Sequence, residues 1–104
     1  MEGFKMLTLN DIDQIENGAE TEEDYFISIQ SAINAGAWGL QGSYGRAMMD
    51  AINGGRCLLG RAVFHDYWGN QIPGRDNVKA GTKGSYDFVS KTMGQEWAAM
   101  MEGV

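Results

Sequence analysis

The stretch "GAWGLQGSYGRAMMDAINGG", residues 36–55, decides how the chain folds, because it joins two helical patterns through closely spaced glycines. The apolar residues of its second half recur at the i, i+3, i+4, i+7 and i+8 spacing of one buried helix face. They are Tyr44, Ala47, Met48, Ala51 and Ile52. We therefore expect a helix over 43–53, capped by Ser43 and ended by the pair Gly54-Gly55.

A longer helix is predicted before this stretch, over residues 21–35. Thr21 suits the N-cap position, because its hydroxyl can accept a hydrogen bond from the amide of Asp24. Tyr25, Ile29 and Ile33 recur every four residues and form the stripe that faces the core. Gly36 is expected to end this helix.

The first twenty residues are expected to form an acidic arm. Residues 1–9 have the pattern of a short strand or a packed arm. Asn10 can cap a short helix that runs from Asp11 to about Asn17, where Gly18 stops it.

After residue 55 the pattern changes to a hairpin and then returns to helix. Gly69-Asn70 predicts a two-residue turn, and Pro73 shortens the returning strand, so a small hairpin is expected near 61–72. Residues 73–84 are expected to form an ordered loop. Ser85 is expected to cap a last helix that runs to about Met101, with Gly94 marking a kink or a close backbone approach.

These elements predict one α+β domain over residues 1–104 that is mostly helical, with three to four helices and a small β-hairpin. Residues 1–20 would be the arm and the short helix. Residues 21–104 would be the helical body, with its hairpin and loop at 57–84. The length is that of a single domain.

The net charge of −6 is distributed unevenly. Residues 1–24 hold eight acidic residues against Lys5, whereas residues 25–104 are close to neutral. Direct binding to duplex DNA by phosphate neutralisation is therefore disfavoured. The acidic run either only solvates its surface or attracts a basic protein partner, of the kind that normally holds nucleic acid. Its predicted contact residues are Glu20, Glu22, Glu23 and Asp24.

Aromatic and basic residues alternate over 61–83. Three interpretations remain open: the aromatic residues fill the core, they anchor a protein interface, or they stack on unpaired nucleobases. The interface interpretation predicts as contacts Tyr67, Trp68, Arg75 and Lys79. We expect a non-enzymatic protein that occupies a surface of a macromolecular partner.

Two other functions are kept as alternatives. The turn at Gly42, Ser43, Gly45 and Arg46 could cradle a phosphate or nucleotide, although it lacks the lysine and the preceding strand of a P-loop. We expect it to be a structural connection. A small enzyme would use His65, with Cys57 as its nucleophile if the fold brings the two together.

Composition argues against several other classes of site. One cysteine allows neither an internal disulfide nor a cysteine-based zinc site, and we expect no metal or other cofactor. No apolar run approaches the length of a membrane span, so a cytoplasmic protein is expected. The methionine-rich last helix makes a homodimer another candidate assembly.

The segments "GSYGRAMMDAI" and "DYWGNQIPGRDNVKAGTKGS" give the chain a resemblance to small acidic accessory proteins of phages and other mobile elements. That group includes anti-CRISPR and anti-restriction inhibitors. The resemblance implies steric inhibition of a host nucleoprotein complex such as CRISPR-Cas, with acidic side chains occupying a basic surface. This chain departs from a DNA mimic because its acidic residues gather at one end.

Overall fold

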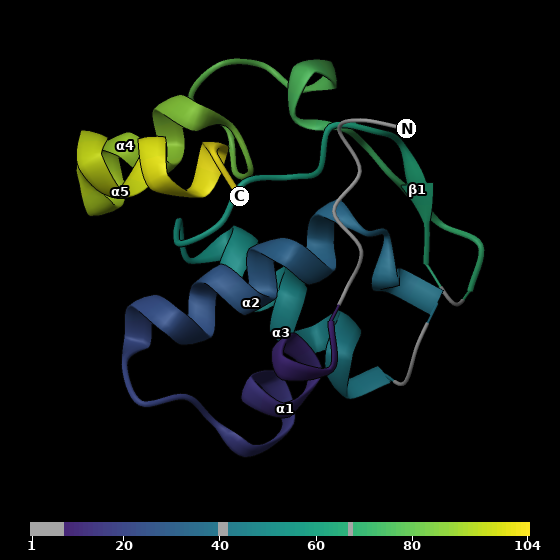
Figure 1. Cartoon of the computed structure of the whole chain (residues 1–104). Helices are drawn as coiled ribbons and strands as arrows, with labels where there is room; N and C mark the ends of the chain where they lie inside the picture. The colour runs from purple at the N-terminus through teal and green to yellow at the C-terminus, as the bar shows by residue number, and fades with distance from the viewer. Residues whose placement is uncertain (1–7, 40–41, 67) are drawn as a thin grey trace.

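The computed structural model describes residues 8–39, 42–66 and 68–104, which form an α+β domain (Figure 1). The described part has five α-helices, two 3-10 turns and a two-stranded antiparallel sheet. In chain order the elements are α1 (Leu9–Asn17), α2 (Glu22–Asn34), η1 (Ala37–Gly39), α3 (Gly42–Asn53), β1 (Phe64–His65), β2 (Gln71–Ile72), η2 (Arg75–Asn77), α4 (Tyr86–Met93) and α5 (Gln95–Glu102). The predicted mostly helical α+β class is confirmed, with more helices than expected.

Helix α2 begins as its sequence predicts. The Thr21 hydroxyl accepts a hydrogen bond from the Asp24 amide at 3.0 Å. Ile29 and Ile33 are fully buried, which confirms the stripe. Gly36 follows the helix with φ +74°, and a Cβ there would collide with the ring of Phe64. Gly36 is therefore required both by its backbone conformation and by the aromatic ring that packs on it.

Helix α1 begins earlier than expected, because Thr8 and not Asn10 is its cap. The Thr8 hydroxyl accepts from the Asp11 amide at 3.1 Å, and the Asp11 carboxylate accepts from the Thr8 amide at 3.2 Å. This reciprocal capping box satisfies two amides at once, which a lone Asn10 could not do. The predicted strand or arm at 1–9 lies almost entirely outside the described residues.

Side chains of α2 and α3 fix α1 in place. The Ser28 hydroxyl contacts Asp11 at 3.0 Å and Gln14 at 2.8 Å. On the other side, the Tyr44 hydroxyl of α3 donates to the Glu16 carboxylate. That hydrogen bond, together with burial and the nearby negative charge, raises the pKa of Tyr44.

Helix α3 has the predicted buried face but not the predicted cap. Met48, Ala51 and Ile52 are at most 2% exposed. The helix begins at Gly42, so Ser43 lies within its first turn instead of capping it. Gly55 leaves the helix with φ +76°, as the expected glycine exit requires.

The segment after α3 runs through the core. Cys57, Leu58 and Leu59 are all at most 4% exposed. The buried Gln30 side chain of α2 donates to the Leu58 carbonyl at 2.9 Å and accepts from the Leu58 amide at 2.7 Å. Because Gln30 satisfies both backbone groups, this segment can be buried without a neighbouring strand.

The hairpin is small, as expected, with Phe64 opposite Ile72 and His65 opposite Gln71. Its turn differs from the predicted two-residue turn, because the loop spans 66–70 and Asp66 organises it. The Asp66 carboxylate accepts from the amides of Trp68 at 2.9 Å and Asn70 at 2.8 Å. Partial desolvation raises the pKa of Asp66, but these hydrogen bonds outweigh it and lower the pKa overall.

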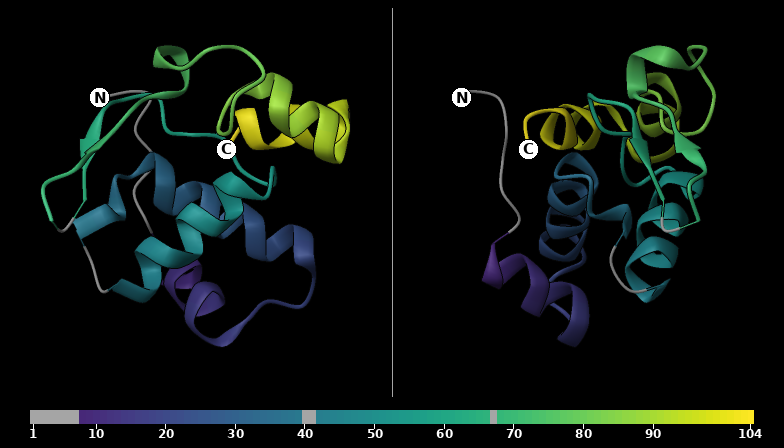
Figure 2. Two further views of the ribbon diagram at one scale, coloured as in Figure 1. Left: turned by 180° about the vertical axis from the view of Figure 1, so that it is seen from behind. Right: turned by 90° about the vertical axis from the view of Figure 1, so that its right-hand side faces the viewer.

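The predicted single helix over 85–101 is wrong, because it is two helices that meet at Gly94. Ser85 caps α4 as expected, accepting from the Phe88 amide at 3.2 Å. Gly94 then has φ +99°, which ends α4 and starts α5 in a new direction. The pair α4–α5 packs together at one side of the α2–α3 layer (Figures 1 and 2).

Candidate functional site

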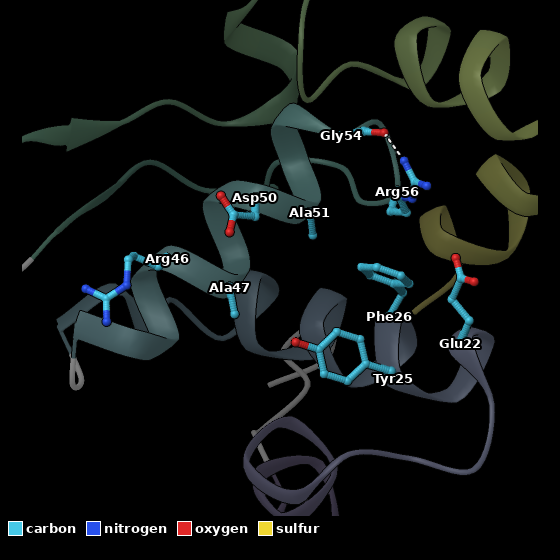
Figure 3. Close-up of a pocket in the computed structure, with 9 residues that line it drawn as sticks. All are labelled: Glu22, Tyr25, Phe26, Arg46, Ala47, Asp50, Ala51, Gly54 and Arg56. Atoms are coloured by element: carbon cyan, nitrogen blue, oxygen red, sulfur yellow. Dashed lines mark hydrogen bonds between the residues drawn. The ribbon is translucent and has the colours of Figure 1, made fainter.

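A groove of about 600 Å³ lies between α2 and α3 (Figure 3). Its volume is within the range of sites that bind small molecules. Its lining comes from the first half of α2, from α3 and from the residues just after α3. These lining residues are Glu22, Tyr25, Phe26, Arg46, Ala47, Asp50, Ala51, Gly54 and Arg56.

The groove exists because large side chains on α2 face small ones on α3. Tyr25 and Phe26 pack edge to face with ring centroids 5.1 Å apart. Opposite them, Ala47 and Ala51 are one helical turn apart on α3 and leave the space between the helices open (Figure 3). Both aromatic rings are half-buried, so apolar surface lines the groove.

Arg56 is held in place at one end of the groove. Its guanidinium donates to the Gly54 carbonyl at 2.7 Å, and its own carbonyl accepts from the indole of Trp97 at 2.8 Å. The Trp97 ring also packs against Phe26, with centroids 6.2 Å apart. The helix dipole favours a cation at the C-terminal end of α3. The Arg56 guanidinium therefore interacts with this helix end and is not free to bind a ligand.

The other charged residues of the groove are less constrained. Glu22 and Asp50 are exposed, and within the described residues their carboxylates make no hydrogen bond or ion pair. Arg46 is exposed and points away from the aromatic pair (Figure 3). In the same view the Asp50 carboxylate lies on the Arg46 side of α3, whereas Glu22 lies on the side of Phe26 (Figure 3).

The predicted acidic run adjoins this groove. All four of its residues are exposed around the start of α2, and they are Glu20, Glu22, Glu23 and Asp24. Glu22 belongs to both the run and the groove lining. The structure thus brings the acidic run together with an apolar surface that includes Tyr25, a residue of the stripe expected to face the core.

The second predicted contact group lies elsewhere. Trp68 is 74% exposed in the hairpin turn, which is at the opposite end of α2 from Glu22 (Figures 1 and 2). Lys79 is exposed in the loop that follows η2, and Tyr67 lies outside the described residues. The acidic run and the aromatic loop therefore do not form one surface.

Arg75, predicted as a contact residue, is only 8% exposed. Its Nε donates to the Leu59 carbonyl at 2.7 Å and its Nη2 donates to Asn34 at 3.3 Å. Burial lowers the pKa of this guanidinium, and the nearby Arg61 lowers it further. Arg75 thus links the loop after β2 to α2, and its side chain is too buried to contribute to a contact surface.

The residues proposed for the enzyme alternative do not form a catalytic arrangement. His65 is exposed on β1, whereas Cys57 is fully buried with its sulfur 3.5 Å from the Phe26 carbonyl. Burial raises the pKa of the Cys57 thiol, which disfavours the nucleophilic thiolate. The Asp66 carboxylate accepts hydrogen bonds from amides of the hairpin turn, and so it does not orient His65.

The predicted phosphate turn is the first part of a helix. Gly42, Ser43, Gly45 and Arg46 all belong to α3. No second feature at this helix start points to an anion within the described residues, apart from the exposed Arg46. The helical state of residues 42–46 is compatible with a structural connection, and anion binding by them stays an untested alternative.

The sequence patterns did not indicate Tyr25, Phe26, Asp50 and Arg56 as lining residues. Tyr25 was expected to face the core, and both rings do pack against it, but each is only half-buried and its remaining surface lines the groove. The sequence gives no signal for this division of one ring between core and groove. Asp50 and Arg56 gave none, because only the packing of α2 on α3 brings them beside the rings.

No protein-family model, curated protein or solved structure was found to match this chain. Within the described residues, no three or more histidine, cysteine or acidic side chains gather as a metal ion would require. Across the same residues, no helix combines the length and apolar character needed to cross a membrane.

Proposed function

We propose that the protein is a non-enzymatic binding protein whose acidic run engages a basic surface of a macromolecular partner. The observation that supports this is the exposure of four carboxylates around the start of α2, with no ion pair among the described residues to neutralise them. A basic surface that normally holds nucleic acid is the partner that the resemblance to small phage inhibitors implies.

The competing explanation is that these carboxylates only stabilise α2. Acidic residues in a first helical turn do interact with the helix dipole, each by about 0.3–1 kcal/mol. Glu20 lies before the Thr21 cap, outside that turn, and so the dipole does not account for it. The first turn of α2 holds three acidic residues, whereas the first turns of α1, α4 and α5 hold one each, which are Asp11, Asp87 and Glu96.

These other helix starts provide a matched control. We would compare the double variant Glu22→Lys/Glu23→Lys with Asp87→Lys/Glu96→Lys. Both pairs are exposed first-turn acids, so both variants change the net charge equally and each removes two acids from helix starts, from α2 alone in the first variant and from α4 and α5 in the control. Only the first pair lies in the acidic run.

The tagged wild-type chain would be used to capture partners from bacterial lysate, and the captured protein would then be purified for titration. We expect binding to weaken at least about tenfold in Glu22→Lys/Glu23→Lys and less than about threefold in the control. The association rate should account for much of the loss and should depend on salt. Equal loss in both variants, or no loss in either, would contradict the proposal.

A further inference from the structure

The groove between α2 and α3 has an aromatic side, a small-residue side and free carboxylates, and each of these restricts what can bind there. Tyr25 and Phe26 offer apolar surface and the faces or edges of two rings. The small side chains of Ala47 and Ala51 leave room in the groove for a ligand group. A ligand that fills the groove must therefore carry an apolar group.

The groove lining itself is charge-balanced, with Glu22 and Asp50 against Arg46 and Arg56. Beyond the Glu22 end, the other exposed carboxylates of the acidic run, those of Glu20, Glu23 and Asp24, add negative charge. Arg56 is already bound to the Gly54 carbonyl at 2.7 Å, and Arg46 points away from the rings (Figure 3). Charge complementarity therefore favours a cationic ligand over an anionic one.

We propose that the groove receives a short basic segment of a partner protein, in which an apolar side chain lies between two arginine or lysine side chains. The apolar side chain would lie against Phe26 and Ala47. The cations would face Glu22 at one end and Asp50 at the other, and one of them would pack on the Tyr25 ring. This inference rests on the proposed function and names the feature that its partner must present.

An arginine fits this site better than a free small cation. Its apolar stem can cover the aromatic rings while its guanidinium donates to a carboxylate at the groove edge. The groove would thereby add selectivity to the acidic run, because a partner that is basic but lacks the apolar side chain gains only the electrostatic attraction.

The test uses three blocked tripeptides as probes, titrated into the isotope-labelled full chain and followed by amide chemical shifts. The first is arginine–leucine–arginine, the second is arginine–serine–arginine, and the third is glutamate–leucine–glutamate. The first two have the same charge and differ in the apolar anchor. We expect the leucine probe to bind about tenfold more tightly than the serine probe, since burying a leucine side chain is sufficient for that ratio.

Two substitutions locate the binding. Ala47→Leu fills the groove from its half-buried alanine, and Ala99→Leu makes the same change at an exposed position of α5. We expect Ala47→Leu to abolish the preference for leucine over serine, and Ala99→Leu to leave it unchanged. The amide spectrum and thermal midpoint of each variant show whether it is folded.

The possible failures are distinguishable. Suppose that both arginine probes bind equally and that Glu22→Lys/Glu23→Lys weakens the binding of both. The proposed role of the acidic run is then supported, and the inference about the groove is wrong. If the glutamate probe binds best, the inferred charge is wrong. If the wild-type chain is a dimer that Ala47→Leu converts to monomers, a second copy occupies the groove, and this inference fails whatever the lysate capture shows.

Discussion

At the scale of single residues, two glycines of the 36–55 stretch have opposite effects on stability. Gly36 has φ +74°, and an added Cβ would collide with the Phe64 ring, whereas Gly45 lies inside α3 with open space around it. Gly36→Ala should therefore reduce the free energy of unfolding by about 2–4 kcal/mol, from backbone strain plus overpacking. Gly45→Ala should increase it by about 0.5–1 kcal/mol, because alanine favours helix.

Denaturant unfolding of the two variants and the wild type measures both effects. The wild type is the reference, and the two variants control for each other because they make the same chemical change. Loss of stability in Gly45→Ala would contradict the open space around this position. A neutral Gly36→Ala would contradict the packing of Phe64 on this turn.

Cys57 provides a second residue-scale prediction, which concerns pH. Burial raises the pKa of its thiol, so folding favours the protonated form. This contribution is complete below the thiol's unfolded pKa of about 8.5 and is lost as pH rises above that value. Between about pH 7.5 and pH 9.5, the free energy of unfolding should fall by about 1 kcal/mol from this group.

The measurement is denaturant unfolding at both pH values, for the wild type and for Cys57→Ala. The variant has lower stability at each pH but should lose less of it as pH rises, because it lacks the titrating thiol. If the two chains have the same pH dependence, Cys57 does not titrate as its burial implies.

At the scale of elements, the sequence determined the parts that depend on local chemistry. Thr21 and Ser85 cap α2 and α4 as predicted, because a cap is recognised from the few residues around it. Gly94 was expected to mark a kink or a close backbone approach, but its complete division of the helix into α4 and α5 was not predicted, since the positive φ of Gly94 depends on how α5 packs beside α4. The burial of Arg75 and Gln30 could not be predicted from the sequence either. Their hydrogen-bond partners, the carbonyls of Leu59 and Leu58, belong to a segment that is distant in the sequence.

The contact between Tyr44 and Glu16 gives an element-scale prediction, because it joins α1 to α3. Tyr44→Phe should lower amide-exchange protection in α1 while α2 keeps its own, since α1 has no fully buried residue. Tyr86→Phe, a half-buried tyrosine of α4, is the matched control and should leave α1 unchanged.

The same contact has a pH dependence with a definite sign. The Glu16 hydrogen bond is the largest cause that raises the pKa of Tyr44, so the contact favours the neutral phenol. It is present below the unfolded tyrosine pKa of about 10 and is lost as pH rises through the higher folded value. Ultraviolet titration should show this tyrosine ionising late, and Glu16→Gln should move its pKa down. No change in Glu16→Gln would contradict the contact.

At the scale of the whole molecule, the packing of helices decides which predicted contact residues lie together. The acidic run adjoins an apolar groove that the sequence did not indicate, while the aromatic hairpin turn is at the far end of α2 (Figure 2). The exposure of acidic residues in a first helical turn can be expected from the sequence, but which surfaces lie side by side depends on how α2 packs on α3. The candidate site was therefore only half predictable.

The charge distribution gives the last prediction. The chain has a net charge of −6, and among residues 8–39, 42–66 and 68–104 no ion pair offsets the acidic residues. Within that part of the chain, added salt therefore screens the repulsion between acidic residues, which stabilises the fold, and weakens no ion pair. Raising NaCl from about 20 mM to about 300 mM should increase the thermal midpoint by a few degrees.

The acidic run should account for much of this response. Glu20→Gln/Glu23→Gln removes two of its charges and should flatten the salt dependence more than Asp76→Asn/Asp87→Asn, which removes two exposed charges elsewhere. A midpoint that falls with salt would mean that attractive pairs dominate. If the prediction holds, repulsion within the run destabilises the free chain, and a basic partner that neutralises it should raise the thermal midpoint most at low salt. Stability and binding would then depend on the same carboxylates.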